Sequence, residues 1–361
     1  MIITRLLINN FRNICNIDLK PSPNFNIIFG RNGSGKTSLL EAVSYLGFAK
    51  SFRTNKFLPL INYNANQFTI SASIQYENII SSDNIGITRF KNRNKNIEIS
   101  INSVKTNRLT DLVDKICVQI IHPQGIELLT GGPDNRRHFI DWGVYYTYPK
   151  FKGLWFKYRH ILNQRNALLK NKSDISQIIM WDDMLCEISE KITNLRIEYL
   201  NCLQEFLKQK LSTFFPNFNL DISFYKGWEN GIELRSILSS NIEKDRFLGY
   251  TFHGCHRADL KIKTENNLAC DTLSRGQLKL LNCALRLSQG LLLKDQCKKK
   301  CIYLVDDFSS EFDSRSKNIF LNDLSSFGFQ VFLTNISSDF AIPDLDNVSF
   351  IDIEKSILNG V

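Results

Sequence analysis

Residues 27–38 read IIFGRNGSGKTS, and this stretch constrains the fold more than any other part of the 361-residue chain. The segment from Gly30 to Thr37 fits the pattern G-x-x-x-x-G-K-[ST] at every fixed position. An apolar run precedes it, and residues 38–46 continue with a helical pattern. Glycines let the backbone N–H groups turn toward an anion, and the helix N-terminus adds the positive end of its dipole. The stretch therefore predicts a strand, a phosphate-binding loop and a helix within a layered α/β sheet.

The loop supplies the expected contacts to a nucleoside triphosphate. Lys36 can reach the terminal phosphates, and Thr37 offers a hydroxyl to Mg²⁺. The alternative is a glycine-rich loop with an incidental lysine. The expected strand before the loop and helix after it argue against this alternative. The expected phosphate-binding residues are Gly30, Arg31, Asn32, Gly33, Ser34, Gly35, Lys36, Thr37 and Ser38.

Two adjacent acids end a second apolar strand, which is expected over residues 301–305. Asp306 is placed to bind Mg²⁺, and Asp307, on the opposite face, to orient the attacking water. Because an aspartate is shorter than a glutamate, we expect slow hydrolysis. The alternative, that the pair only caps a strand, is weaker in a chain that also carries the phosphate-binding loop.

Residues 273–277 read LSRGQ and open a helical pattern that runs to Leu293. Ser274, Gly276 and Gln277 therefore lie at a helix N-terminus that can bind phosphate, although Ser274 alone would suit a simple helix cap. An L-S-x-G-Q turn ahead of an Asp-Asp strand resembles the signature of the ABC-type ATPases. That resemblance implies that two chains associate head to tail, so that Ser274 and Gly276 of one chain cover the nucleotide bound by the other.

Further blocks narrow the resemblance to the RecF family of DNA-repair ATPases. The strand that ends in the two acids continues as DDFSSEFD (306–313), and the family's other blocks occur in the family's order. These are NNFRN (9–13), SFRT (51–54), LLTGGPDNRRHFIDW (128–142), HRADL (256–260) and DTLSRGQLKLLNCALRLSQG (271–290). The resemblance implies a Rad50-like α/β ATPase head with an antiparallel β subdomain, a smaller helical second domain, and ATP and Mg²⁺ as cofactors.

The resemblance also assigns roles to individual residues. Arg12 and Asn13 are expected to lie against the nucleotide, and Asp313 in the loop that crosses the dimer seam. Gln124 is expected to face the metal and to assist catalysis. Thr334 stands where transporter ATPases carry a switch histidine, and Phe312 replaces a more usual leucine.

The function implied is that of an ATP-dependent DNA-binding protein in recombinational repair and replication restart. The resemblance implies ATP-dependent homodimers and a weak DNA-dependent ATPase. It also implies help in loading RecA at single-strand gaps with RecO and RecR, and support of the SOS response. The expected DNA partners are single-stranded, gapped and duplex DNA.

The charge of the chain agrees with a polyanionic partner. Lys and Arg number 45 against 36 Asp and Glu, which leaves a formal net charge of +9. Each phosphate contact would exchange for counterions, so affinity should fall steeply with salt. Without a recognition-helix or zinc-finger pattern, backbone and junction shape should dominate over base reading. The residues expected to contact DNA are Arg136, Arg137, Lys150, Lys152, Lys157 and Arg159, with solvated or structural side chains as the alternative.

Hydrophobic periodicity divides the chain into three segments. Residues 1–120 hold the phosphate-binding loop and alternating patterns that predict antiparallel ribbons between 66 and 104. Residues 121–245 are expected to form the helical insertion, with helical spacing bracketed by Pro149 and Pro216. Residues 246–361 are expected to complete the ATPase domain.

Cysteine spacing and hydropathy exclude several classes. The nine cysteines include no C-x-x-C pair, which argues against a zinc ribbon or a disulfide framework. The start MIITRLLINNF is too short and polar for a signal peptide, and no run is long enough to span a bilayer, so a cytoplasmic protein without a membrane partner is expected. A transporter ATPase subunit, an SMC-type structural head and a scaffold with vestigial hydrolysis remain alternatives.

Overall fold

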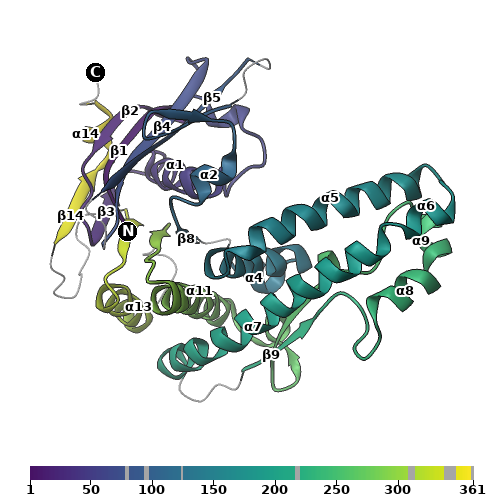
Figure 1. Cartoon of the computed structure of the whole chain (residues 1–361). Coiled ribbons are helices and arrows are strands. Elements are labelled where there is room, and N and C mark those ends of the chain that lie inside the picture. Colours follow the sequence, from purple (N-terminus) through teal and green to yellow (C-terminus); the bar gives the residue numbers. More distant parts are fainter. Residues whose placement is uncertain are drawn as a thin grey trace. The chain divides into compact units, whose positions relative to one another are not determined.

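A computed structural model describes residues 1–77, 81–92, 97–122, 125–215, 220–307, 314–336 and 347–358 (Figure 1). The chain forms two compact units, the first made of Met1–Gly125 with Lys298–Val361 and the second of Ile126–Cys297. The division differs from the expected one, because residues 246–297 belong with the second unit.

A parallel sheet forms the centre of the first unit, with strands in the order β14-β3-β13-β12-β8. The predicted strands before the phosphate-binding loop and before the two acids are β3 and β12. Because all neighbours are parallel, the carboxyl ends of these strands meet at one edge, where α/β sheets bind ligands. The strands are β3 (Phe25–Phe29), β8 (Val118–Ile121), β12 (Ile302–Val305), β13 (Gln330–Thr334) and β14 (Val348–Asp352).

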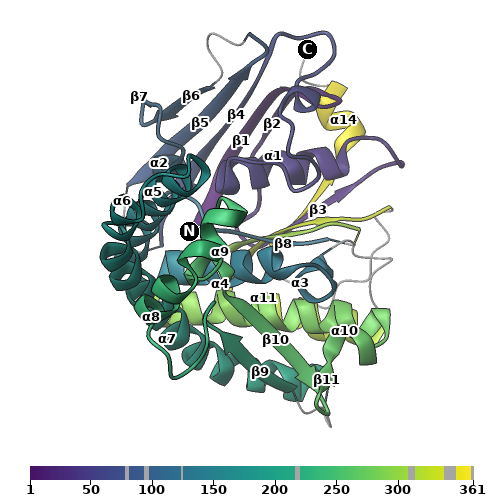
Figure 2. The same ribbon diagram turned by 90° about the vertical axis from the view of Figure 1, so that its right-hand side faces the viewer.

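An antiparallel sheet in the order β2-β1-β4-β5-β6-β7 forms the second layer of this unit (Figure 2). Along β4, Phe68, Ile70, Ala72 and Ile74 are buried while the residues between them are not, which confirms the predicted alternation. The strands are β1 (Ile2–Phe11), β2 (Ile14–Leu19), β4 (Gln67–Gln75), β5 (Ser82–Phe90), β6 (Ile97–Ile101) and β7 (Val104–Thr106).

Helix α1 (Lys36–Phe48) packs between the two sheets (Figure 2). Every residue from Ser38 to Gly47 is buried, as expected of a helix covered on all sides. This placement fixes the helix N-terminus, and with it the phosphate-binding loop, at the edge of the parallel sheet. The other helices of the unit are η1 (Leu58–Leu60), α2 (Leu109–Val113), α13 (Ser314–Ser326) and α14 (Ile353–Leu358).

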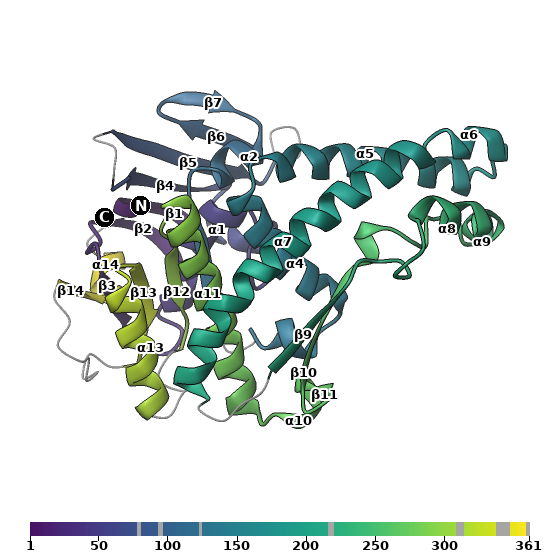
Figure 3. The same cartoon turned by 60° about the horizontal axis from the view of Figure 1, so that its bottom comes forward.

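The second unit is built mainly on helices, and α5 and α7 run side by side, joined through α6 (Figure 3). The predicted helical spacing between Pro149 and Pro216 is confirmed. Gly143 on α4 permits close contact with α7, because a Cβ there would lie 2.0 Å from the Tyr199 ring. The long helices are α4 (Pro133–Thr147), α5 (Lys150–Lys170), α7 (Asp182–Phe214) and α11 (Arg275–Cys297).

A small antiparallel sheet in the order β11-β10-β9 completes the second unit, and periodicity did not predict it. It draws residues 246–297 into this unit, because β10 pairs with β9, and α11 packs on α7 and α4. Among the described residues, no helix combines the length and apolarity needed to cross a bilayer. The remaining elements are α3 (Glu127–Thr130), α6 (Ile175–Ile179), β9 (Leu220–Tyr225), α8 (Leu234–Ser240), α9 (Ile242–Leu248), η2 (Cys255–Arg257), β10 (Asp259–Thr264), β11 (Asn267–Leu268) and α10 (Ala269–Thr272).

Candidate nucleotide-binding site

The loop between β3 and α1 has the backbone that its glycines predict. Gly30, Gly33 and Gly35 have φ values of +148°, +81° and +112°, a region that side chains disfavour. A Cβ on Gly30 would also lie 2.8 Å from Ile353 Cγ2, and one on Gly35 would lie 3.1 Å from Asn13 Nδ2. The predicted strand, loop and helix are confirmed. Backbone conformation favours glycine at all three positions, and limited space favours it at Gly30 and Gly35 as well.

Lys36 lies folded back over this loop. Its Nζ donates to the carbonyl oxygens of Gly30 at 2.6 Å and Arg31 at 2.9 Å. Burial lowers the pKa of the ammonium group, and the nearby Asp306 carboxylate partly offsets this effect. The lysine is thus positioned over the loop by backbone oxygens, and its charge can reach a phosphate bound there.

Hydroxyl groups join the two acids to the loop. Thr37 Oγ1 donates to Asp306 Oδ1 at 3.0 Å, and Thr334 Oγ1 donates to the same Oδ1 at 2.8 Å. Thr334 Oγ1 also accepts a hydrogen bond from the Asp307 backbone N–H at 2.8 Å. Asp307 has φ +50°, an unusual conformation for a residue with a side chain, so Thr334 helps to hold both acids in place. The pKa of Asp306 is raised by burial, and hydrogen bonds from the two threonines oppose that shift.

The oxygen atoms of Thr37 and Asp306 suit Mg²⁺, which prefers hydroxyl, carboxylate and phosphate oxygens. When bound, Mg²⁺ would neutralise charge on the phosphates. Gln124, expected to face the metal, lies outside the described residues, as do Asp313 and Phe312.

Asn13 lies next to the phosphate-binding loop and Arg12 lies against α1, and their expected contact with the nucleotide stays a prediction. Arg12 makes a two-pronged ion pair with the fully buried Glu41 of α1, Nη2 to Oε1 at 2.7 Å and Nε to Oε2 at 3.0 Å. Asn13 donates to the Gly33 carbonyl at 3.1 Å and accepts from Ser38 Oγ at 2.9 Å. Asn13 therefore braces the loop directly, whereas Arg12 is anchored on the helix behind it.

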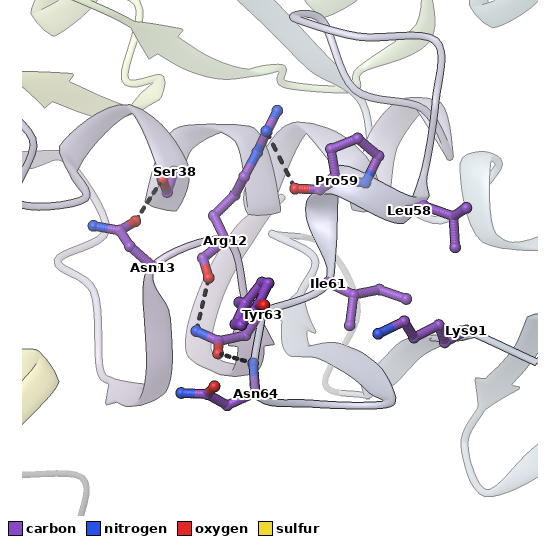
Figure 4. A pocket seen from close by; sticks show the side chains of 10 residues that line it. Arg12, Asn13, Ser38, Leu58, Pro59, Ile61, Tyr63, Asn64 and Lys91 are labelled. Carbon is purple, nitrogen blue, oxygen red and sulfur yellow. Dashed lines mark hydrogen bonds between the residues drawn. The ribbon is translucent and has the colours of Figure 1, made fainter.

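Beside these residues lies an open pocket of about 720 Å³ (Figure 4). Arg12, Asn13 and Ser38 line the side next to the loop, and Ile61, Tyr63 and Lys91 are among the residues that line the remainder. Its volume falls within the range of small-molecule sites, and Tyr63 is 96% exposed. No motif marked Tyr63 or Lys91, because they are brought here by the turn after η1 and by the end of β5.

The last described helix also contacts the loop. The Arg31 backbone N–H donates to Glu354 Oε1 at 3.1 Å, and Ile353 packs against Gly30. Sequence reasoning missed both residues, since β14 and α14 carry no recognisable motif. They reach the loop because β14 pairs with β3 in parallel, so that the two strands end side by side.

In the second unit, the LSRGQ turn forms a reciprocal cap at the start of α11. The Ser274 N–H donates to Gln277 Oε1 at 2.9 Å, and the Gln277 N–H donates to Ser274 Oγ at 3.3 Å. Ser274, Gly276 and Gln277 are exposed. Ser274 therefore caps the helix, the exposed turn is accessible to a ligand, and its contact with a nucleotide stays a prediction.

Two of the residues expected to contact DNA are used inside the second unit. Arg136 pairs with Asp259 at 2.7 Å and 3.1 Å, and Arg137 donates to the Ala258 carbonyl at 2.7 Å. Their side chains are only 16% and 15% exposed. This geometry favours the structural alternative, because the two arginines join the GGPDNRR and HRADL blocks.

The basic run on α5 separates into surface and core. Lys150, Lys157 and Arg159 are exposed and Lys152 is half-buried. Arg165 is fully buried, with its guanidinium bonded to Asp182 at 2.8 Å and to Asp245 at 2.7 Å. The exposed members of the run keep their predicted role as DNA contacts.

The fold and the site define a nucleotide-binding head of the class that contains RecF, RecN and SMC proteins. A family model described as "RecF/RecN/SMC N terminal domain" matches residues 2–353. An Smc head domain from Pyrococcus furiosus shares this fold, with a TM-score of 0.55 at 15% identity over 93% of this chain and 90% of that chain.

Closer relatives specify the family. The DNA replication and repair protein RecF of Shewanella piezotolerans is 42% identical over 336 residues, which cover 93% of this chain and 92% of the relative. RecF of Vibrio cholerae is 41% identical over 353 residues, 97% of this chain and 96% of the relative. A solved structure titled "recombination mediator protein RecF-ATP in RecFOR pathway" has a TM-score of 0.86 at 25% identity, over 95% of this chain and 94% of that chain. The chain belongs to the RecF family.

Proposed function

We propose that the chain is an ATP-dependent DNA-binding protein of recombinational repair and replication restart, and that it hydrolyses ATP slowly. The observation that carries the proposal is the convergence of Lys36, Thr37, Asp306 and Thr334 at one sheet edge, beside a glycine-shaped loop. The RecF structures determined with ATP have the same fold, which supports ATP as the nucleotide.

Each group has a defined task in this proposal. The loop amides and Lys36 bind the phosphates, and Thr37 and Asp306 would supply oxygen ligands to Mg²⁺. Asp307 orients the attacking water, with its backbone held by Thr334. The pocket beside Arg12 and Asn13 receives the base and ribose.

Dimerisation completes the site. The exposed Ser274 and Gly276 contact the nucleotide bound by a second copy of the chain, and Gln277, which already caps Ser274, holds the turn in shape. ATP then shifts the monomer–dimer equilibrium by its preference for the closed pair. Asp313 and Gln124 keep their proposed roles at the seam and at the metal.

The proposed partners are single-stranded and gapped or duplex DNA, with RecO and RecR, and indirectly RecA. Two solved RecF structures are described as recombination mediators in the RecFOR pathway, which supports RecO and RecR as partners. Exposed Lys150, Lys157 and Arg159 would contact phosphates. Loading of RecA at gaps and support of the SOS response complete the proposal.

The central test measures ATP hydrolysis with and without gapped DNA over a salt series. DNA should stimulate turnover, and the stimulation should fall steeply with salt because phosphate contacts release counterions. Light scattering on the Asp307→Asn protein with Mg²⁺ and ATP should show twice the monomer mass. Turnover indifferent to DNA at low salt would contradict the DNA-dependent activity, and a protein that stays monomeric would contradict the shared site.

A further inference from the structure

Aromatic and basic side chains gather on an exposed surface of the second unit, on α9 and the segment that follows it. Lys244 and Phe247 lie on α9, and Tyr250, Phe252 and Arg257 follow. Phe247 is 90% exposed, and Tyr250 and Phe252 are each 37% exposed. These five residues are called the aromatic-basic cluster here, and the nucleotide site does not use them.

The cluster members stack on one another. Lys244 Nζ lies 4.2 Å from the ring centroid of Phe252. Arg257 Cζ lies 5.2 Å from the Tyr250 ring and 5.8 Å from the Phe252 ring. Lys244 and Phe247 are three residues apart on α9 and so share one face of the helix. Lys244, Phe252, Arg257 and Tyr250 therefore form one connected group, and Phe247 lies on the same face of α9 as Lys244.

A buried polar network holds the rings outward. Thr251, between the two rings, is 1% exposed, and its N–H and Oγ1 donate to Asn166 Oδ1 at 2.8 Å and 2.7 Å. The fully buried Asp245 accepts from the Phe252 N–H at 3.0 Å and from Arg165 at 2.7 Å. Thr251 is thus fixed inward, while Tyr250 and Phe252 on either side of it are exposed. The exposure of the rings is thus built into the fold.

The surroundings add positive charge. Gly249 packs beside Lys170, because a Cβ on the glycine would lie 3.9 Å from the lysine Cα, and Lys170 is exposed at the end of α5. Of the nearby acids, Asp245 is buried against Arg165, and Glu243 pairs with Arg246 at 3.4 Å. A ligand here meets aromatic faces bordered by cations.

We infer that the aromatic-basic cluster binds single-stranded nucleic acid, with bases stacked on Tyr250, Phe252 and Phe247 and phosphates contacting Lys244 and Arg257. Bases of a single strand expose their faces, whereas a duplex buries them, so exposed rings favour the single strand. The inference deepens the DNA binding proposed above, on which it rests, and assigns base stacking to a defined surface.

The test uses fluorescence anisotropy with the full chain and three labelled probes of about 16 nucleotides or base pairs, namely oligothymidylate, an abasic strand and a duplex. The Tyr250→Ala, Phe252→Ala double variant should raise the Kd for oligothymidylate about tenfold to hundredfold, and leave the duplex Kd within about twofold. The parent should bind the abasic strand more weakly than oligothymidylate, and the double variant should lose that difference. Phe252→Tyr should retain affinity, and Phe350→Ala, at an exposed ring of β14, is the matched control.

A direct readout is emission from a Phe252→Trp variant, which should be quenched by oligothymidylate and unaffected by the abasic strand. If the double variant fails to fold, Phe247→Ala gives the same comparison, because that ring is 90% exposed and contributes little to packing.

The outcomes separate the two proposals. A double variant that binds oligothymidylate like the parent overturns the cluster and leaves the proposed function intact. A parent that binds oligothymidylate and the abasic strand equally also overturns the cluster. So does a double variant that loses a protein partner while its DNA binding is unchanged. A parent that binds no DNA with or without ATP overturns both.

Discussion

Charged side chains serve different ends in the two units. In the first unit, Lys36 is held by the carbonyl oxygens of Gly30 and Arg31, within a loop that glycines keep open to an anion. In the second unit, Arg165 and Arg196 are fully buried and bonded to carboxylates. The comparison shows that Lys36 keeps its charge available to a ligand, whereas the charges of Arg165 and Arg196 are already neutralised by carboxylates.

The largest effect should come from breaking the buried pairs of the second unit. Arg165→Met leaves Asp182 and Asp245 buried without their guanidinium, and should lower the free energy of unfolding by about 3–5 kcal/mol. Denaturant unfolding followed by circular dichroism measures it. Lys157→Met, at an exposed position of the same helix, should change stability by less than about 0.5 kcal/mol. Equal stability of the two variants would show that the buried ion pairs of Arg165 do not stabilise the second unit.

The first unit should show the opposite behaviour. Lys36→Ala should leave the unfolding transition unchanged and reduce ATP hydrolysis about 10²–10³-fold, because the phosphates lose a positioned cation. Lys50→Ala, an exposed lysine just beyond the end of α1, is the matched control and should hydrolyse ATP like the parent. A Lys36→Ala protein with normal turnover would show that the loop lysine is not functional.

A smaller effect should follow from removing the hydroxyl that joins the two acids. Thr334→Val keeps the shape of the side chain but loses the hydrogen bond to Asp306 and the one from the Asp307 N–H. The activation free energy of hydrolysis should therefore rise by about 1.5–3 kcal/mol. Thr334→Ser should restore the rate. Turnover and nucleotide binding measured side by side separate positioning from binding, and a valine variant with the parent's rate would contradict the positioning role.

The smallest effect is a pH dependence of the second unit. Burial lowers the pKa of His256 to about 4, while its ring nitrogens bond to Tyr158 Oη and the Thr251 carbonyl. The unfolded chain, with a histidine pKa of about 6.5, then binds more protons than the folded chain, so stability falls as pH drops from about 6.5 toward 4. Between pH 7 and 5, roughly 1–2 kcal/mol should be lost through this group. In denaturant titrations at the two pH values, the free energy of unfolding of His256→Gln should fall less than that of the parent. An equal fall in both proteins would exclude His256 as the source of the pH dependence.

Local patterns were sufficient for most of the elements. The glycines, the alternation along β4 and the helical spacing of α5 and α7 are short-range constraints, and each appears where it was predicted. The β9–β11 sheet was missed because its strands are short and because β9 pairs with β10, a strand much further along the chain. The second compact unit ends at Cys297 rather than at the expected residue 245, because β10 and α11 pack within it.

The phosphate-binding loop, the paired acids and the signature turn could be predicted from the amino-acid sequence, because each is a contiguous stretch of residues. Which charged side chains remain available to a ligand depends instead on the folded protein. Packing between elements far apart in the chain brings Glu354 to the phosphate-binding loop and Tyr63 to the pocket beside Arg12. It also pairs Arg136 with Asp259. The reason is physical, since the burial and pairing of a long side chain depend on neighbours that no local pattern specifies.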